Sequence, residues 1–209
     1  DLYISNAVQQ GDASLSPEKN SAFKIGSRYR QTGFSAVLSG FYTHGKDMID
    51  WVQTTETELT DSKYHVMNIG KLDNMGFNVD AEIYMNELLP RCFVTNIRLG
   101  YAYINQNHET ETEILRSLYA LEYLRHKAVF GLDHKIWSKL SASWSVRWQQ
   151  RMNGYHPYTK VDCKVMWNDR KYSVYVKADN ITCHRYYDLF AVKQPGLWVM
   201  AGVSVNLGW

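Results

Sequence analysis

The chain has 209 residues and a formal net charge of +2, so it is long enough for one large domain and gives no argument for a nucleic-acid partner. No segment approaches the roughly eighteen consecutive apolar residues of a transmembrane helix, although strands that cross a membrane carry a weaker signal. The three cysteines lack motif spacing and the seven histidines form no H-x-x-x-H pair. We therefore expect no disulfide framework, no metal site and no cofactor.

Alternation of apolar and polar residues predicts nine β-strands, because successive side chains of a strand point to opposite faces. The predicted strands span residues 20–30, 34–43, 75–86, 93–103, 119–136, 140–151, 160–167, 172–179 and 197–209. The fifth strand changes phase at 123–125, which predicts a β-bulge there. Within the long connection 44–72, we expect 48–52 and 64–67 to extend the flanking strands as a hairpin.

The ninth strand carries the clearest pattern. Its odd positions from Leu197 to Trp209 are all apolar, whereas the even positions from Gly202 onward are small or polar. Seven consecutive apolar positions on one face suit a tilted strand that crosses a membrane. From the third strand to the ninth, every Lys, Arg, Asp and Glu in the alternating cores lies on the polar face, as lipid contact on the other face requires.

Periodicity alone permits two architectures. In a membrane barrel the apolar face is exposed on the outside of the protein, whereas a soluble all-β sandwich, which would suit a binding or adhesion module, buries that face against a second sheet. The two differ in the burial of six apolar-face residues, which are Phe77, Ile97, Trp144, Val165, Val176 and Val203.

The connections favour the barrel. Short turns at 31–33, 87–91, 137–139 and 168–171 alternate with longer segments at 44–72, 105–118, 152–157 and 181–195. Outer-membrane barrels combine short periplasmic turns with longer extracellular loops, and a periplasmic C-terminus assigns every connection consistently. The outward aromatics also divide into two girdles. Those at the periplasmic edge are Trp167, Tyr172 and Trp209, and those at the outer edge are Tyr42, Tyr101, Tyr103 and Trp148.

We therefore predict an all-β fold, an antiparallel up-and-down transmembrane β-barrel. Nine strands cannot close a bacterial single-chain barrel of even strand number. Residues 1–209 are thus expected to be a single partial domain, the C-terminal part of a larger barrel whose other strands and signal peptide lie upstream.

The order of several short motifs resembles the TonB-dependent outer-membrane receptors. Residues 11–19 are similar to the G-N-x-x-L-x-P-E stretch of that family, with Asp12 in place of Asn. Further resemblances follow in order at Gly26-Ser27-Arg28-Tyr29, at Phe41-Tyr42 with 47–51, at Asn68-Ile69-Gly70 with Gly76-Phe77, and at Asp179-Asn180-Ile181 with Tyr186-Tyr187 and Pro195-Gly196. Taken together, these motifs resemble Bacteroidetes members of the family, of the siderophore or cobalamin type.

This resemblance implies a function and a set of partners. Receptors of this family import a scarce nutrient across the bacterial outer membrane through a barrel of about 22 strands, filled by an N-terminal plug that contacts TonB. The expected partners are outer-membrane lipid, the protein's own plug and N-terminal strands, TonB through the plug, the barrel assembly machinery and a small-molecule nutrient. A terminal aromatic such as Trp209 resembles the family's assembly signal.

Candidate functional residues divide by location, and none of them forms an enzyme motif. Aromatic side chains in or beside the long loops are the candidate ligand contacts, because Trp and Tyr supply large contact area at low entropy cost. They are Trp51, Tyr64, Tyr155, Tyr186 and Tyr187. Charged residues of the polar face are expected to face the lumen, and they are Asp80, Glu82, Arg98, Arg147, Lys164 and Lys177.

Overall fold

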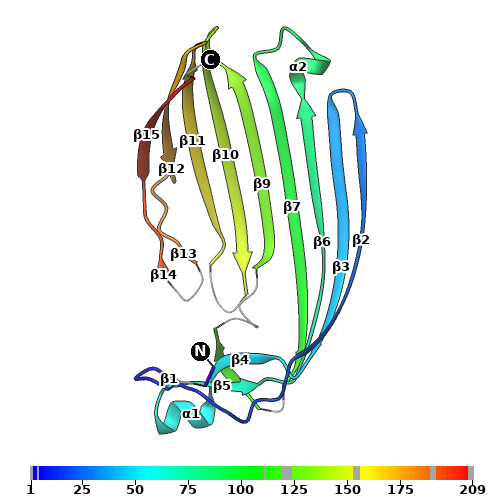
Figure 1. Ribbon diagram of the computed structural model, residues 1–209, viewed down its shortest axis with the longest axis vertical. Helices are drawn as coiled ribbons and strands as arrows, with labels where there is room; N and C mark the ends of the chain where they lie inside the picture. Colours follow the sequence, from blue (N-terminus) through cyan, green and yellow to red (C-terminus); the bar gives the residue numbers. More distant parts are fainter. Residues whose placement is uncertain are drawn as a thin grey trace.

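The computed structural model describes residues 2–3, 5–110, 112–118, 124–152, 156–188 and 192–206. Its main feature is one curved antiparallel sheet of nine strands, in which every strand pairs with its neighbours along the chain (Figure 1). The strands are β2 (Lys19–Gln31), β3 (Phe34–Lys46), β6 (Lys71–Tyr84), β7 (Val94–Glu109), β9 (Leu124–Lys135), β10 (Leu140–Arg151), β11 (Tyr158–Asn168), β12 (Tyr172–Asp179) and β15 (Trp198–Val205). The predicted up-and-down order of nine strands is confirmed.

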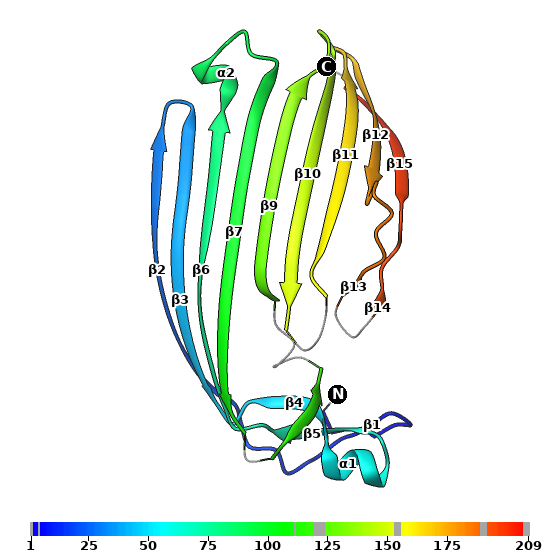
Figure 2. The ribbon, with the colours of Figure 1, turned by 180° about the vertical axis from the view of Figure 1, so that it is seen from behind.

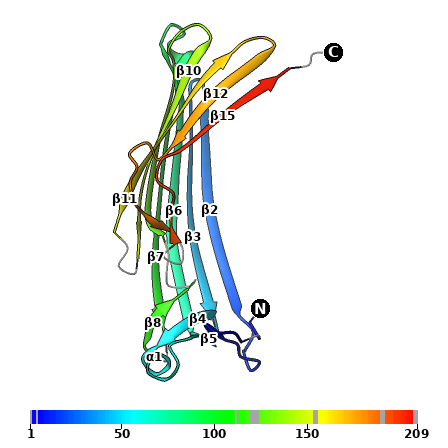
Figure 3. The ribbon, with the colours of Figure 1, turned by 90° about the vertical axis from the view of Figure 1, so that its left-hand side faces the viewer.

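The connections alternate between the two ends of the sheet. Figures 1 and 2 show the short connections at one end, including the helical turn α2 (Met85–Leu88) between β6 and β7. The long connections gather at the opposite end. Seen from the side, the sheet bends along its length (Figure 3). β15 ends at the short-connection end, as the alternation of loop lengths predicts.

A second sheet forms at the long-connection end. It has four strands in the order β1 (Gln9–Gln10), β5 (Tyr64–Asn68), β4 (Ile49–Thr54) and β8 (Ile114–Ser117), and α1 (Thr55–Thr60) links β4 to β5. We call it the loop sheet. A two-stranded hairpin, β13 (Tyr187–Asp188) with β14 (Val192–Lys193), belongs to the last long connection.

The register of the strands places the apolar residues of neighbouring strands side by side on one face of the sheet. Directly opposed residues of an antiparallel pair share a face. One such row crosses seven strands through Tyr29, Ala36, Ala81, Leu99, Phe130, Val146 and Val161. The rows on either side of it are also mainly apolar, so the alternation of each strand adds up to a continuous apolar surface.

This apolar face is open. Val203 is 67% exposed, Val176 50%, Phe77 40% and Val165 37%, and Ile97 and Trp144 are only partly buried. Within the described residues no second sheet packs over them. The sandwich alternative is therefore wrong, and the face has the exposure that a lipid-contacting wall requires. No helix in the described part of the chain is long and apolar enough to cross a membrane.

The outer aromatic girdle is present as a contact cluster. Tyr101, Tyr103 and Trp148 surround His126, whose ring centroid lies 5.0 Å from that of Tyr103 and 6.1 Å from that of Trp148. The Tyr101 hydroxyl lies 2.8 Å from Nδ1 of His126. At the other end, Trp167 and Tyr172 flank the short turn between β11 and β12. Trp209 lies outside the described residues.

Several strand boundaries differ from the prediction. β3 continues to Lys46, β6 begins at Lys71, and β7 continues through Asn105 to Glu109, residues that the sequence places in connections. These extensions pair beyond the apolar rows and are mostly polar, so they lack the apolar alternation. The 48–52 and 64–67 hairpin exists, but it belongs to the loop sheet and does not extend the flanking strands, since β4 pairs with β8.

The structure shows two local irregularities in β9, a bulge and a histidine on the apolar face. In the pairing of β9 with β10, Gln150 opposes His126 while Arg151 opposes Leu124, so Arg125 is the extra residue of the predicted bulge. β9 is described from Leu124 onward, and the remainder of the predicted fifth strand lies outside the described residues. His134, which interrupts the apolar face, accepts a hydrogen bond from Nε1 of Trp144 at 3.1 Å.

Candidate functional site

A pocket of about 270 Å³ lies at the start of β11. The rings of Tyr158 and Tyr186 stack with centroids 4.4 Å apart, and the ring of His184 lies 6.4 Å from that of Tyr158 at 21°. His156, Arg185 and Tyr187 complete the lining with Pro157. We call this the Tyr158 pocket. It combines aromatic surface, imidazole nitrogens and one guanidinium.

Asn180 shapes the loop that carries this pocket. Its side chain is 1% exposed and its backbone is left-handed, with a φ of 53°, which Asn tolerates better than most residues. The amide Nδ2 donates to the carbonyl oxygens of His184 at 2.9 Å and Pro195 at 3.3 Å, and Oδ1 accepts from the His184 amide at 3.0 Å. The backbone amide of Asn180 donates to Oδ1 of Asp162 at 2.7 Å. The buried Asn180 side chain therefore joins both ends of the loop, and the Asn180 backbone amide ties the loop to β11.

Tyr158 itself is held in place by a residue of the neighbouring strand β10. Only 9% of it is exposed, and its hydroxyl accepts a hydrogen bond from Nε2 of Gln149, which is 5% exposed on β10. The ring is thus held by the wall of the sheet, whereas Tyr186 and His184 approach it from the loop. This arrangement gives a rigid aromatic floor with more exposed residues around it.

The predicted ligand contacts separate into two groups. Tyr186 and Tyr187 belong to the Tyr158 pocket, and Tyr187 is 50% exposed. Trp51 and Tyr64 belong to the loop sheet, where Trp51 is only 7% exposed and so offers a ligand little of its ring. Tyr155 lies outside the described residues. The role of these residues as ligand contacts remains a prediction.

Most of the buried apolar side chains of the described chain lie in or beside the loop sheet. Val52 of β4 is fully buried, and Val66 of β5, Ile69 after it and Leu72 at the start of β6 are each less than 5% exposed. The buried Asp50 accepts hydrogen bonds from Oγ of Ser117 and from the Trp51 amide. This segment is therefore a small packed unit at the long-connection end, rather than a set of open loops.

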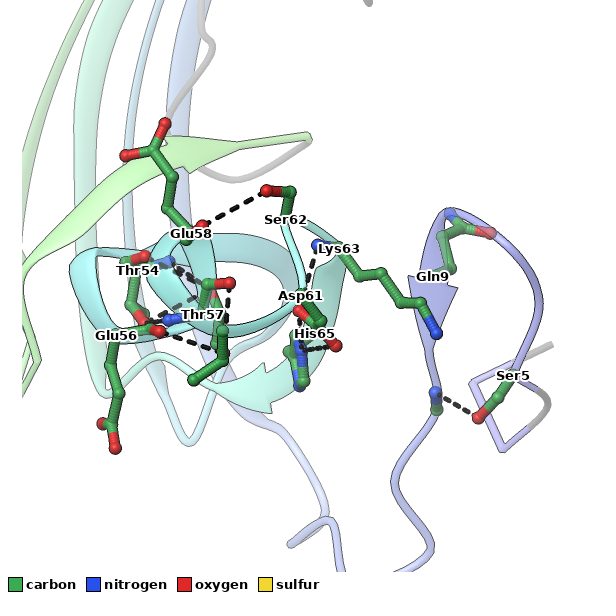
Figure 4. Close-up of polar contacts among 12 residues, drawn as sticks. Ser5, Gln9, Thr54, Glu56, Thr57, Glu58, Asp61, Ser62, Lys63 and His65 are labelled. Atoms are coloured by element: carbon green, nitrogen blue, oxygen red, sulfur yellow. Dashed lines mark hydrogen bonds and ion pairs between the residues drawn. The ribbon is translucent and has the colours of Figure 1, made fainter.

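A capped helical turn closes the loop sheet (Figure 4). Thr54 accepts from the Thr57 amide at 3.2 Å and Oγ1 of Thr57 accepts from the Thr54 amide at 2.9 Å, which is a reciprocal capping box. After α1, Asp61 accepts from the Lys63 amide at 3.1 Å and lies 3.2 Å from Nε2 of His65. These contacts, the Lys63 amide first, hold the pKa of Asp61 below its ordinary value of 3.8.

All six predicted lumen residues project from the polar face. Asp80, Glu82 and Arg98 line a hollow of about 720 Å³ over β3, β6, β7 and β9. Nη2 of Arg98 lies 3.0 Å from a carboxylate oxygen of Asp133, while Glu82 accepts from Nδ2 of Asn96 at 2.6 Å. The remaining three, Arg147, Lys164 and Lys177, share this face by register on β10, β11 and β12.

Several side chains of this wall lie flat across glycines of the next strand. A Cβ atom at Gly131 would come within 2.9 Å of Nε of Arg98, and one at Gly202 within 2.6 Å of the Tyr175 ring. Arg98 and Tyr175 are the direct cross-strand partners of these glycines. Lys164 then places its Nζ 4.7 Å from the Tyr175 ring centroid. Arg98 and Tyr175 therefore pack closely over the backbone of the neighbouring strand.

The sequence predicts Tyr186 and Tyr187 of this pocket but misses Tyr158 and Asn180. Tyr158 falls between the predicted loop 152–157 and the predicted strand 160–167, and Asn180 stands out only as part of a family-like Asp-Asn-Ile motif. The left-handed Asn180 after a strand could have indicated a structured turn. Among the described residues, no three His, Cys, Asp or Glu side chains converge as a metal site.

Comparison with known proteins assigns the family. The model of the family described as TonB dependent receptor-like, beta-barrel matches residues 1–181. The chain belongs to this family of outer-membrane transporters, which are not enzymes.

Solved structures with similar folds agree with this assignment. The copper transporter OprC aligns with a TM-score of 0.70 and 16% identity over 92% of this chain and 32% of its own. The FrpB iron transporter from Neisseria meningitidis (F3-3 variant) gives 0.69 and 16% over 94% and 31%. The siderophore receptor PirA from Acinetobacter baumannii gives 0.64 and 15% over 93% and 32%. This chain thus spans about a third of their length.

Proposed function

We propose that residues 1–209 form the C-terminal part of a TonB-dependent transporter that imports a scarce nutrient across the bacterial outer membrane. The observation that carries this proposal is the open apolar face, continuous in register across the nine-stranded sheet. The family match supports it, as do similar folds whose names give copper, iron and siderophores as cargo. The plug, the other strands and TonB are the partners that such a transporter requires.

The orientation follows from the two ends of the sheet. The short connections face the periplasm, and the loop sheet and the Tyr158 pocket face the outside. The polar face then lines the lumen and meets the plug, and Trp209 takes part in recognition by the barrel assembly machinery. The similarity to Bacteroidetes receptors remains a prediction about origin.

The Tyr158 pocket supports a substrate class. Stacked tyrosines offer flat apolar contact, and Arg185 offers a positive charge for an anionic group. Two imidazoles nearby can donate or accept hydrogen bonds. An anionic metal chelate with a planar group, such as a ferric siderophore, matches this chemistry better than a neutral sugar does.

Transport by the full-length receptor tests the proposal. A strain that lacks the gene is complemented with the wild type or with Arg185→Ala/Tyr186→Ala, and uptake of labelled ferric catecholate, ferric hydroxamate and cyanocobalamin is measured. We expect TonB-dependent uptake of one probe and a half-saturation concentration raised about tenfold or more in the variant, as for loss of a binding hot spot.

The matched control is His65→Ala, which alters a partly exposed side chain of the loop sheet outside the Tyr158 pocket. Uptake that does not depend on TonB would contradict the transporter function. Equal uptake by the pocket variant and the control would show that the ligand does not bind the Tyr158 pocket, and would not contradict the transporter function.

A further inference from the structure

One region of the apolar face has a notch. Gly40 of β3 lies directly between Ile25 of β2 and Phe77 of β6, and it has no side chain to fill that position. A groove of about 380 Å³ lies over this position. Tyr103 lines it in the same row as Phe77, and Tyr42 lines it in the next row toward the long connections. We call it the Gly40 groove. Its walls are almost entirely apolar.

A row of lysines crosses the same face nearer the long connections. Lys19 lies directly opposite Lys46, and Lys71 of the next strand is on the same face. We call these three residues the lysine row. Like charges directly opposed across two strands destabilise a sheet unless an anion compensates them. Lys71 has such an anion, because its Nζ lies 2.9 Å from Oε2 of Glu109.

Lys19 and Lys46 have no such compensation in the described chain. The nearby Asp73 is engaged by Nδ1 of His44 at 2.7 Å and by the Tyr42 hydroxyl at 2.8 Å. Glu18, adjacent in sequence, accepts from the Ile49 amide at 2.6 Å. Both lysines are exposed, and no ion pair joins either to a described carboxylate. The pair therefore leaves an unmatched positive charge at this edge of the apolar face.

The lysine row and the Gly40 groove lie within the length of one lipid molecule. Each lysine is four residues from the apolar row formed by Phe23, Tyr42 and Met75, which is about 13 Å along a strand. The side chains share one face, and lysine stems can bend toward a membrane interface. A molecule with an anionic head and a long apolar chain would meet both features at once.

We infer that the lysine row and the Gly40 groove bind one phosphorylated glycolipid of the outer leaflet, an inference that rests on the outer-membrane placement proposed above. Its phosphate groups lie against Lys19 and Lys46, and one acyl chain occupies the groove. A zwitterionic phospholipid fits less well, because its own ammonium group would meet the two lysines. The phosphate groups of the lipid neutralise the positive charges of Lys19 and Lys46.

The test uses full-length receptor purified in mild detergent, with bound lipid measured by native mass spectrometry. The probes are purified lipopolysaccharide of deep-rough type, inorganic phosphate and phosphatidylethanolamine. We expect Lys19→Ser/Lys46→Ser to weaken lipopolysaccharide binding roughly 25-fold, at roughly fivefold for each lysine. Gly40→Leu should also weaken it, since a Cβ at Gly40 meets only ordinary contacts at 3.8 and 3.9 Å and the side chain would fill the groove.

Lys24→Ser is the matched control, because Lys24 is on β2 but on the opposite face. Equal lipid binding by the double lysine variant and this control would overturn the inference. Displacement of the lipid by inorganic phosphate, with no effect of Gly40→Leu, would also overturn it by reducing the site to an anion site. Uptake of nutrient is measured in parallel. Normal uptake with unchanged lipid binding refutes only this inference, whereas a receptor absent from the outer membrane refutes the proposed function as well.

Discussion

At the scale of single residues, Asn180 organises the Tyr158 pocket. Asn180→Ala removes three side-chain hydrogen bonds to the backbone and places Ala at a positive φ. We expect a local loss of about 3 kcal/mol and exchange of the His184 amide faster by on the order of 100-fold, measured by hydrogen exchange.

Asn180→Gly separates the two causes. Glycine accepts the backbone conformation but makes none of the side-chain bonds, so it should give a smaller acceleration than alanine. An unchanged exchange rate at the His184 amide in Asn180→Ala would show that the loop is held by other contacts.

Asp61 gives a pH-dependent prediction. Its pKa is lowered in the folded loop, so its contribution to local stability is fully present above pH 3.8 and is lost as the pH falls through the lower, folded-state pKa. We expect pepsin to cut after the exposed Leu59 increasingly as the pH falls below 3.8. Asp61→Asn, digested in parallel, corrects for the pH dependence of pepsin itself. A constant ratio of the two cleavage rates across this range would contradict the assignment.

At the scale of elements, β10 offers adjacent positions on opposite faces. Val146 belongs to the central apolar row, whereas Ser145 lies on the polar face directly opposite Asp162. Arg at position 146 would face lipid near the membrane centre and should cost about 2–4 kcal/mol. We expect Val146→Arg to lower the fraction of receptor that keeps the mobility of a folded barrel in unheated gels.

Ser145→Arg is the companion variant. Its guanidinium would reach water and the Asp162 carboxylate, so its folded fraction should stay near that of the wild type. If both variants folded equally well or equally poorly, the two faces would not differ in environment and the membrane assignment of the sheet would be wrong.

Period-two alternation was enough to predict the nine-stranded sheet. The alternation identified the apolar face because charged residues are disfavoured on the lipid-facing side of each strand. It did not predict the strand ends that lie beyond the apolar rows. Asn105 to Glu109 is polar on both faces and was assigned to a loop, yet it continues β7 opposite the first residues of β6. The bulge at Arg125 was predictable because a one-residue insertion shifts the phase of the pattern.

The candidate site was less predictable than the fold. Loop aromatics could be named from composition, but which of them meet depends on long-range contacts. Trp51 and Tyr186 look alike in the sequence, and the structure buries one in the loop sheet and places the other on the Tyr158 ring. Asn180 holds the pocket loop through hydrogen bonds to backbone groups. An Asn after a strand can indicate a turn, but the sequence does not show which backbone groups it binds.

At the scale of the whole molecule, the pairing pattern sets an order of folding. Neighbouring strands of the large sheet follow one another in its order along the chain, and the pairs β2–β3, β6–β7, β9–β10 and β11–β12 can each close by themselves with a short turn. The loop sheet differs, because β4 (Ile49–Thr54) pairs with β8 (Ile114–Ser117) across the whole β6–β7 hairpin. That hairpin must be in place before β8 can reach β4. We therefore expect the large sheet to form before the loop sheet, and the loop sheet to be able to open while the large sheet stays intact.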